Sequence, residues 1–362
     1  MFVAWRELRF ARGRFLLIGA VVALITLLVG FLSGLTGGLA AQNVSAVLAL
    51  PGDRIVLQQP ATGSPSYATS AVDADAVRAW EQADGVSAVL PIGIAQSRAS
   101  AAAGDPTGVA LFGLPTDERG TSSDPLSELS PHSDSGVGLS AGAAKALDAR
   151  AGDTVTIGGS EFTVEKVGGD LWYSHTPAVV MTAASWSAAS LRTGGTGEAT
   201  VLAVSGSPDW DAVAQRTGTV AQTPLASLTA LETFKSEVGS LGLMIALLFG
   251  ISALVVGAFF TVWTMQRAGD IAVLKALGAS TASLIRDSLG QASVVLVAGI
   301  AVGLAAVLGL GALAGQALPF VVSPLTTVAP AVALALLGLA GAAFALRSVT
   351  TSDPLTALGS NR

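Results

Sequence analysis

Long runs without a charged residue constrain this chain most strongly. No Asp, Glu, Lys or Arg occurs in residues 15–52, 238–266 or 288–346. A hydrocarbon core ~30 Å thick is crossed by ~20 apolar residues of helix. The first two runs are therefore long enough for one span each, and the third for two spans with a short outer loop (316–327) between them. We predict transmembrane helices over residues 15–41, 238–263, 288–315 and 328–346.

Composition and charge support this interpretation and orient the chain. Residues are 51% hydrophobic and 12% charged, and the mean hydropathy is +0.64, outside the range of ordinary soluble proteins. Residues 42–237 hold 10 Lys/Arg against 21 Asp/Glu, whereas basic residues flank the apolar runs. The positive-inside rule then predicts that residues 42–237 lie outside and that both termini are cytoplasmic. The flanking basic residues are Arg6, Arg9, Arg12, Arg14, Arg267, Lys275, Arg286 and Arg347.

The two ends of the chain flank these spans. Residues 1–14 are interpreted as an interfacial elbow helix or a plain positive-inside anchor, and residues 347–362 as a cytoplasmic tail. A secretory signal shares the basic start, but its apolar region is usually only ~7–15 residues long, which favours a retained helix over 15–41. The cell membrane is the expected location, with the lipid bilayer and no nucleic acid as a partner.

The segment between the first two spans has the pattern of a mixed α/β domain. Strand-like runs occupy 53–59 and 108–114, Asp73 and Ser140 are placed to cap helices, and TVTI and FTVEKV read as a hairpin over 154–167. Residues 121–135 are polar and proline-bearing, which predicts an exposed loop. The fold class is thus an integral membrane α-helical protein with four transmembrane helices and an α/β extracytoplasmic domain inserted between the first and second.

Several function classes lack their motifs. The sequence contains no G-x-x-x-x-G-K-[ST], H-E-x-x-H or G-x-S-x-G and no cysteine. We therefore expect no enzyme, no intrinsic cofactor and no nucleotide site in this chain, so that ATP would be hydrolysed by another subunit. Because the predicted spans carry no ionisable group, an ion-coupled carrier is disfavoured. Cargo taken from the outer leaflet would need no charged channel.

Small residues in the first span suggest close packing. Gly30, Gly34 and Gly38 form a GxxxGxxxG ridge that would let another helix approach.

The cytoplasmic segment 264–287 carries the most specific signal. Within QRAGDIAVLKALGAS (266–280), apolar positions recur at helical spacing, which predicts a short amphipathic helix that lies in the interface or docks on a partner. The stretch resembles the coupling segment of FtsX/MacB-type ABC transporter permeases, R-x-x-E-I-A-x-L-K-A-L-G-A-S, with Asp270 where that family usually has Glu. The segments RELRFARGRF, L-S-x-x-A-A-K-A-L followed by G-D-x-V-x-I, and the D-P-x-x-A-L tail resemble the same family. The coupling residues are Arg267, Asp270, Ile271, Leu274, Lys275, Leu277 and Gly278.

The resemblance implies a homodimeric permease bound to two copies of an ATPase subunit that binds ATP and Mg. The first apolar stretch and WYSHTP are most similar to the haem-exporting permeases of Gram-positive bacteria, which implies haem as transported substrate. A MacB-like exporter of macrolide, peptide or lipoprotein remains open, as does an FtsX-like mechanotransmitter that activates a cell-wall hydrolase. The FtsX outer domain is much smaller than the segment 42–237, which favours transport. A membrane-anchored binding protein would leave the coupling segment unexplained.

Five residues are candidates for haem binding. A Met thioether is a known axial ligand for haem iron, and Met244 lies about two turns inside the second span. Glu237, seven residues earlier, is close to the same helical face, and Glu232 is a substitute. The alternative is that Met244 packs and Glu237 is a solvated helix-end charge. The outer residues Tyr173 and His175 are also chemically able to ligate iron.

Overall fold

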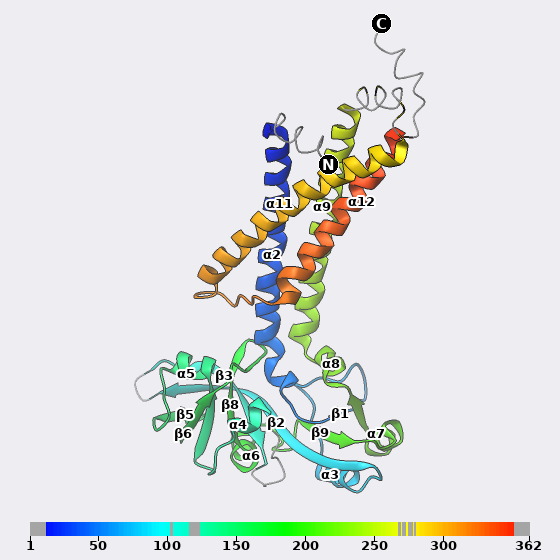
Figure 1. Ribbon diagram of the computed structural model, residues 1–362. Coiled ribbons are helices and arrows are strands. Elements are labelled where there is room, and N and C mark those ends of the chain that lie inside the picture. The colour runs from blue at the N-terminus through cyan, green and yellow to red at the C-terminus, as the bar shows by residue number, and fades with distance from the viewer. Residues whose placement is uncertain are drawn as a thin grey trace. The chain divides into compact units, whose positions relative to one another are not determined.

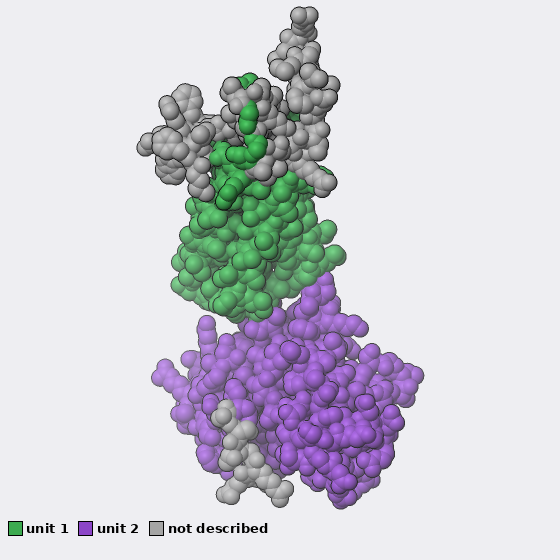
Figure 2. All heavy atoms as spheres, turned by 45° about the vertical axis from the view of Figure 1, so that its right-hand side comes forward, with its two compact units in different colours: residues 1–38, 240–362 green, residues 39–239 purple. Residues whose placement is uncertain are grey.

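The computed structural model describes residues 12–101, 104–115, 124–266 and 280–350, together with Gly269, Val273 and Gly278. The chain divides into two compact units, one made from residues 1–38 and 240–362 and the other from residues 39–239 (Figure 2). The predicted elbow over 1–14 lies almost entirely outside the described residues, as does the end of the tail.

The described residues include four long apolar helices, as predicted, each long enough to cross a membrane. They extend beyond the predicted spans: the first continues past Ala41, and the second begins before Val238 (Figure 1). Hydrophobicity marks the part of a helix that lipid can surround, but backbone hydrogen bonds continue into polar sequence, so the helix ends differ from the predicted span ends. The helices are α2 (Arg12–Leu48), α9 (Glu232–Gln266), α11 (Thr281–Ala314) and α12 (Ala329–Thr350).

The glycine ridge of α2 has two kinds of neighbour. A Cβ at Gly30 would lie 2.8 Å from Val307 of α11, so a helix does approach closely there. A Cβ at Gly38 would lie within 1.8 Å of the Pro319 carbonyl oxygen, and one at Gly34 would overlap the Phe320 ring. At these two positions the glycines therefore admit the connection between α11 and α12 rather than a helix.

That connection is more ordered than a plain loop over 316–327. The Val321 N–H donates to the Gly34 carbonyl oxygen at 3.1 Å. A π-helical turn, η2 (Pro324–Val328), follows, and Ser323 and Thr326 cap it reciprocally.

The outer unit is built on ten strands in the order β10-β1-β9-β2-β3-β8-β4-β6-β5, with β7 paired to β8. The first half of the long strand β2 pairs with β9, and its second half pairs with both β3 and β5. Because β5 pairs back to β2, the strands β2, β3, β8, β4, β6 and β5 close into a barrel, while β10, β1, β9 and β2 form an open sheet. The strands are β1 (Arg54–Gln58), β2 (Val86–Ala101), β3 (Thr107–Leu114), β4 (Gly136–Ser140), β5 (Thr154–Ile157), β6 (Ser160–Gly168), β7 (Trp172–Tyr173), β8 (Thr176–Thr182), β9 (Val201–Gly206) and β10 (Thr219–Gln222).

Short helices cover these strands. One hydrophobic cluster joins β1 and β9 to α3 and α7 around the fully buried Trp80, and another fills the barrel beneath α5 and α6. A third contains the outer end of α2, including Val44 and Val47. The remaining helices of this unit are α3 (Ala74–Glu81), α4 (Pro125–Glu128), α5 (Ala141–Leu147), α6 (Ala183–Arg192), α7 (Trp210–Thr217), α8 (Pro224–Ser227) and the 3-10 turn η1 (Leu228–Ala230).

Local sequence signals hold well in this unit, with one correction. Asp73 caps α3 and Ser140 caps α5, and β5 and β6 form the predicted hairpin. The prediction of an exposed loop over 121–135 is wrong for residues 124–129, whereas residues 132–135 are exposed as predicted. Asp124 caps the helical turn α4, and Leu126 and Leu129 are buried. Two leucines at helical spacing are enough to bury a short turn within a polar segment.

Candidate functional site

The turn between β7 and β8 has an unusual backbone. Ser174 and His175 adopt φ values of 49° and 64°. Two consecutive positive φ values are typical of a type I′ hairpin turn, where Asn and Gly are preferred, and a non-glycine residue there costs about 1–3 kcal/mol. Two backbone hydrogen bonds stabilise the turn: Ser174 N–H donates to the carbonyl oxygen of Asn43, and His175 N–H to that of Gln42, at 2.9 and 3.0 Å. These hydrogen bonds from the turn to the outer end of α2 therefore stabilise its strained backbone.

This turn places His175 against Glu237 of α9. The Nε2 atom of His175 lies 2.7 Å from Glu237 Oε1, and the two side chains are 32% and 36% exposed. The second carboxylate oxygen, Oε2, accepts a hydrogen bond from Asn43 Nδ2 at 3.1 Å. Two residues that sequence reasoning considered separately are thus in direct contact.

Two hydroxyls complete the arrangement. Thr233 Oγ1 donates to Asn43 Oδ1 at 3.0 Å, and Ser174 Oγ lies 2.9 Å from Thr233 Oγ1. Because the Thr233 proton is already donated, the Ser174 hydroxyl is the donor of the second bond. We call these five residues, Asn43, Ser174, His175, Thr233 and Glu237, the stem cluster.

The stem cluster offers ligand chemistry as well as structure. Imidazole nitrogen and carboxylate oxygen are both able to bind iron, and the partial exposure of His175 and Glu237 leaves them accessible. Among the described residues no group of three or more His, Cys, Asp or Glu side chains could hold a metal ion alone.

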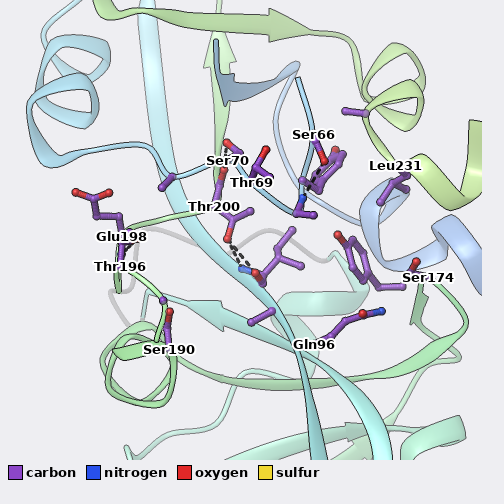
Figure 3. Close-up of a pocket in the computed structure, with 18 of the residues that line it drawn as sticks. Ser66, Thr69, Ser70, Gln96, Ser174, Ser190, Thr196, Glu198, Thr200 and Leu231 are labelled. Atoms are coloured by element: carbon purple, nitrogen blue, oxygen red, sulfur yellow. Dashed lines mark hydrogen bonds between the residues drawn. The ribbon is translucent and has the colours of Figure 1, made fainter. Parts of the chain in front are cut away.

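Apart from the stem cluster, the outer unit contains a cleft of about 610 Å³ (Figure 3). Ser174 and Leu231 lie on one side of the view, and Ser190 and Glu198 on the other. Most lining hydroxyls already have internal partners: Ser70 donates to the Thr200 carbonyl oxygen, and the Thr200 hydroxyl bonds the backbone of Ile94.

Two of the predicted haem-binding residues, Tyr173 and Glu232, line this cleft. Tyr173 is 7% exposed and packs edge-on against Phe112 and Tyr67. Burial raises the pKa of the Tyr173 phenol above its ordinary value, which disfavours the phenolate that would bind iron. Glu232 is exposed at the first position of α9.

The other predicted site residues lie elsewhere. Met244 belongs to the membrane unit, where its side chain is 48% exposed. Of the coupling residues, only Gly278 lies within the described part of the chain. Its φ of 92° requires glycine. Arg267, Asp270, Ile271, Leu274, Lys275 and Leu277 fall outside the described residues.

Sequence reasoning missed Asn43 and Thr233. Asn43 is fully buried although it lies in an uncharged run next to the first span. A lone polar residue at that place reads as a helix end, because its partners come from residues more than 120 positions away. The pair Ser174 and His175, which stands at a hairpin turn without a glycine, would have been a useful signal, because such a pair indicates a strained backbone.

In the part of the chain that the structure describes, four helices long enough to cross a membrane, with an α/β unit inserted after the first, define a class of multipass membrane protein with an inserted α/β domain. The model of the MacB-like periplasmic core domain matches residues 15–220, and that of the FtsX-like permease C-terminal region matches residues 242–354. The chain therefore belongs to the FtsX/MacB family of ABC-type permeases.

The relatives that match are similar over their whole length. A protein of Staphylococcus haemolyticus described as a putative hemin transport system permease protein, HrtB, is 24% identical over 363 residues, covering 99% of each chain. Its counterpart of the same description in Staphylococcus epidermidis is 24% identical over 369 residues, again covering 99% of each.

Two solved structures also match. The extracellular domain of the noncanonic ABC-type transporter YknZ from Gram-positive bacteria covers 47% of this chain and 99% of its own, at 12% identity and a TM-score of 0.32. The periplasmic region of MacB from Actinobacillus actinomycetemcomitans covers 52% and 94%, at 11% identity and a TM-score of 0.33.

Proposed function

We propose that this chain is the permease subunit of an ABC-type efflux pump that exports an amphipathic molecule, haem, from the outer leaflet. The main support is the contact between His175 Nε2 and Glu237 Oε1 at 2.7 Å, which brings two iron-binding groups together in the outer unit. The full-length similarity to permeases described as hemin transporters supports the same cargo. Haem is substrate here, and ATP with Mg binds the partner subunit.

The assembly we propose is a homodimer of this chain with two ATPase subunits. In the most apolar 18-residue stretch of the second span, 6% of the residues are buried within the described chain, against 39% in the corresponding stretch of the third span. Exposed Leu247 and Ile251 lie on this helix. A second copy would cover that face, and lipid is the alternative. A disulfide between two copies of Leu247→Cys, absent for Leu24→Cys on α2, would support the dimer, and the reverse result would contradict it.

Haem titration of the purified permease, followed by absorption, tests the cargo. His175→Ala and Glu237→Ala are each expected to shift the Soret band and to weaken binding at least tenfold, because each removes one iron-binding group. Met244→Ala tests the thioether, and an unchanged spectrum and affinity would remove Met244 from the site.

Matched variants assign the site. Tyr173→Phe and Glu232→Gln alter the cleft and leave the stem cluster intact, so they are expected to bind haem as the unchanged chain does. If these two weaken binding while His175→Ala does not, the cleft and not the stem cluster binds the cargo.

A further inference from the structure

One buried amide joins three elements of the outer unit. Asn43, at 0% exposure, donates from Nδ2 to Glu237 and accepts at Oδ1 from Thr233. Glu237 and Thr233 are four residues apart, so both lie on one face of α9. The Asn43 carbonyl oxygen also accepts from the Ser174 N–H of the β7–β8 turn. A single residue of α2 thus bonds both α9 and the turn.

The chemistry of these bonds is specific to asparagine. Only a side chain with a donor on one atom and an acceptor on the other satisfies a carboxylate and a hydroxyl donor together. An aspartate here would face Glu237 with a second negative charge, and an apolar side chain would remove the hydrogen bonds to Glu237 and Thr233. The amide therefore fixes α9 against α2 in one register.

These hydrogen bonds join the ends of two long helices. The segments they join, the outer end of α2 and the start of α9, belong to the compact unit 39–239. Each continues without a break along a helix of 37 or 35 residues. The stem cluster bonds these two helices to each other and to the β7–β8 turn.

We propose that the stem cluster is a clasp that stays closed throughout the transport cycle, and that Asn43 is the positioning residue that holds it. The clasp makes the outer end of α2, the start of α9 and the β7–β8 turn one rigid body, so that helix movement is passed to the outer domain without slack. This inference rests on the proposed ATP-driven permease function; its cross-linking test does not depend on haem as the cargo, whereas its rescue test does.

Cross-linking in the cysteine-free chain tests whether the clasp stays closed. The hydroxyl oxygens of Ser174 and Thr233 lie 2.9 Å apart, so sulfur atoms at the same positions need only a small shift to form a bond of ~2.05 Å. With the complete permease–ATPase complex, Ser174→Cys/Thr233→Cys is expected to oxidise at the same rate without nucleotide, with ADP and in the vanadate-trapped state. The exposed pair Ser133→Cys/Ser135→Cys, whose oxygens lie 3.3 Å apart, controls for the oxidant.

Two results would overturn the clasp. A rate that falls severalfold in one nucleotide state, while the control pair is unchanged, means that the cluster opens during the cycle. Failure to cross-link in every state contradicts the geometry itself. Neither reading depends on the identity of the cargo, so it stands if haem is not exported.

A rescue experiment tests Asn43 as the residue that holds the clasp. Asn43→Leu, of similar size, is expected to lower haem export into proteoliposomes at least tenfold, and ATP hydrolysis is measured alongside. Oxidised Ser174→Cys/Thr233→Cys in the same chain should restore most of the export, and reduction should abolish it again.

A cargo-binding or merely structural role for Asn43 would not be rescued by a bond between two other residues. Unimpaired export by Asn43→Leu, or export that the disulfide does not restore, would refute the positioning role. If Asn43→Leu does not fold, the cross-linking rates, measured with Asn43 in place, decide the question.

Discussion

Glu165 illustrates at the residue scale how the outer domain organises a single carboxylate. Its Oε2 accepts from the His132 backbone N–H at 2.7 Å and faces His132 Nδ1 at 3.0 Å, while Oε1 accepts from the Ser133 hydroxyl at 2.8 Å. These donors, the His132 backbone N–H foremost, lower the pKa of Glu165 to about 2. The carboxylate therefore ties the segment after α4 to β6.

This lowered pKa predicts a defined pH dependence for Glu165→Gln. A depressed pKa in the folded state stabilises the fold above the unfolded pKa of ~4.3, and this contribution is lost as the pH falls towards about 2. Glu165→Gln should lower the free energy of unfolding at pH 7 by about 1–2 kcal/mol, and the difference should shrink below pH 4. Thermal unfolding of the full chain in detergent, followed at pH 7 and pH 3, measures both values. A difference that is equal at the two pH values would contradict the assignment.

Residues whose role is set by near neighbours were predictable from the sequence, whereas the stem cluster was not. Asp73 and Ser140 cap helices that begin at the next residue, so a short window contains the whole interaction. The partners of Asn43 lie 190 and 194 positions away, and only the folded chain brings them together. Chemistry singled out His175 and Glu237 as iron-binding types, but their contact depends on a strained turn that composition does not reveal.

At the scale of elements, α2 depends on glycine where another backbone approaches it. A Cβ at Gly38 would lie 1.8 Å from the Pro319 carbonyl oxygen, so Gly38→Ala is expected to destabilise the protein by about 1–3 kcal/mol. Gly19→Ala on the same helix is the matched control, because a Cβ there has nothing within 4 Å. It should be neutral or stabilising by up to ~1 kcal/mol. Thermal unfolding in detergent compares the two, and equal effects would contradict the packing argument.

The coupling segment 264–287 remains a prediction from sequence, since six of its seven coupling residues lie outside the described residues. If Ile271, Leu274 and Leu277 bind a groove on the ATPase, each buried side chain contributes about 1.5–3 kcal/mol. Leu274→Asp should then abolish co-purification of the ATPase or uncouple its activity. Val273→Asp is the matched control, because Val273 is 57% exposed and lies 100° away around a helix. If ATPase activity is coupled normally in Leu274→Asp, the segment lies in the membrane interface and does not dock on the ATPase through Leu274.

At the scale of the whole molecule, charge asymmetry predicts the topology. Residues 42–237 should lie outside and the segment 264–287 inside. In the cysteine-free chain, Ser64→Cys at an exposed position should react in intact cells with a membrane-impermeant maleimide, whereas Val273→Cys should react only after permeabilisation. The opposite labelling pattern would contradict this topology.

The architecture was predictable to the extent that it follows from hydrophobic runs. Uncharged stretches gave the four membrane helices, and motif resemblance gave the family, whose models match residues 15–220 and 242–354. The closure of β2 against β5 into a barrel was not predictable, because strand pairing between distant segments leaves no periodic trace in the sequence.

Growth of a deletion strain across haem concentrations tests most directly whether this permease exports haem. Loss of the chain should lower the haem concentration at which growth stops by at least severalfold. The unchanged chain should restore tolerance, while Glu237→Ala and Leu274→Asp, expressed at the same level, should not. Equal growth of the deletion and parent strains at every haem concentration would contradict the account.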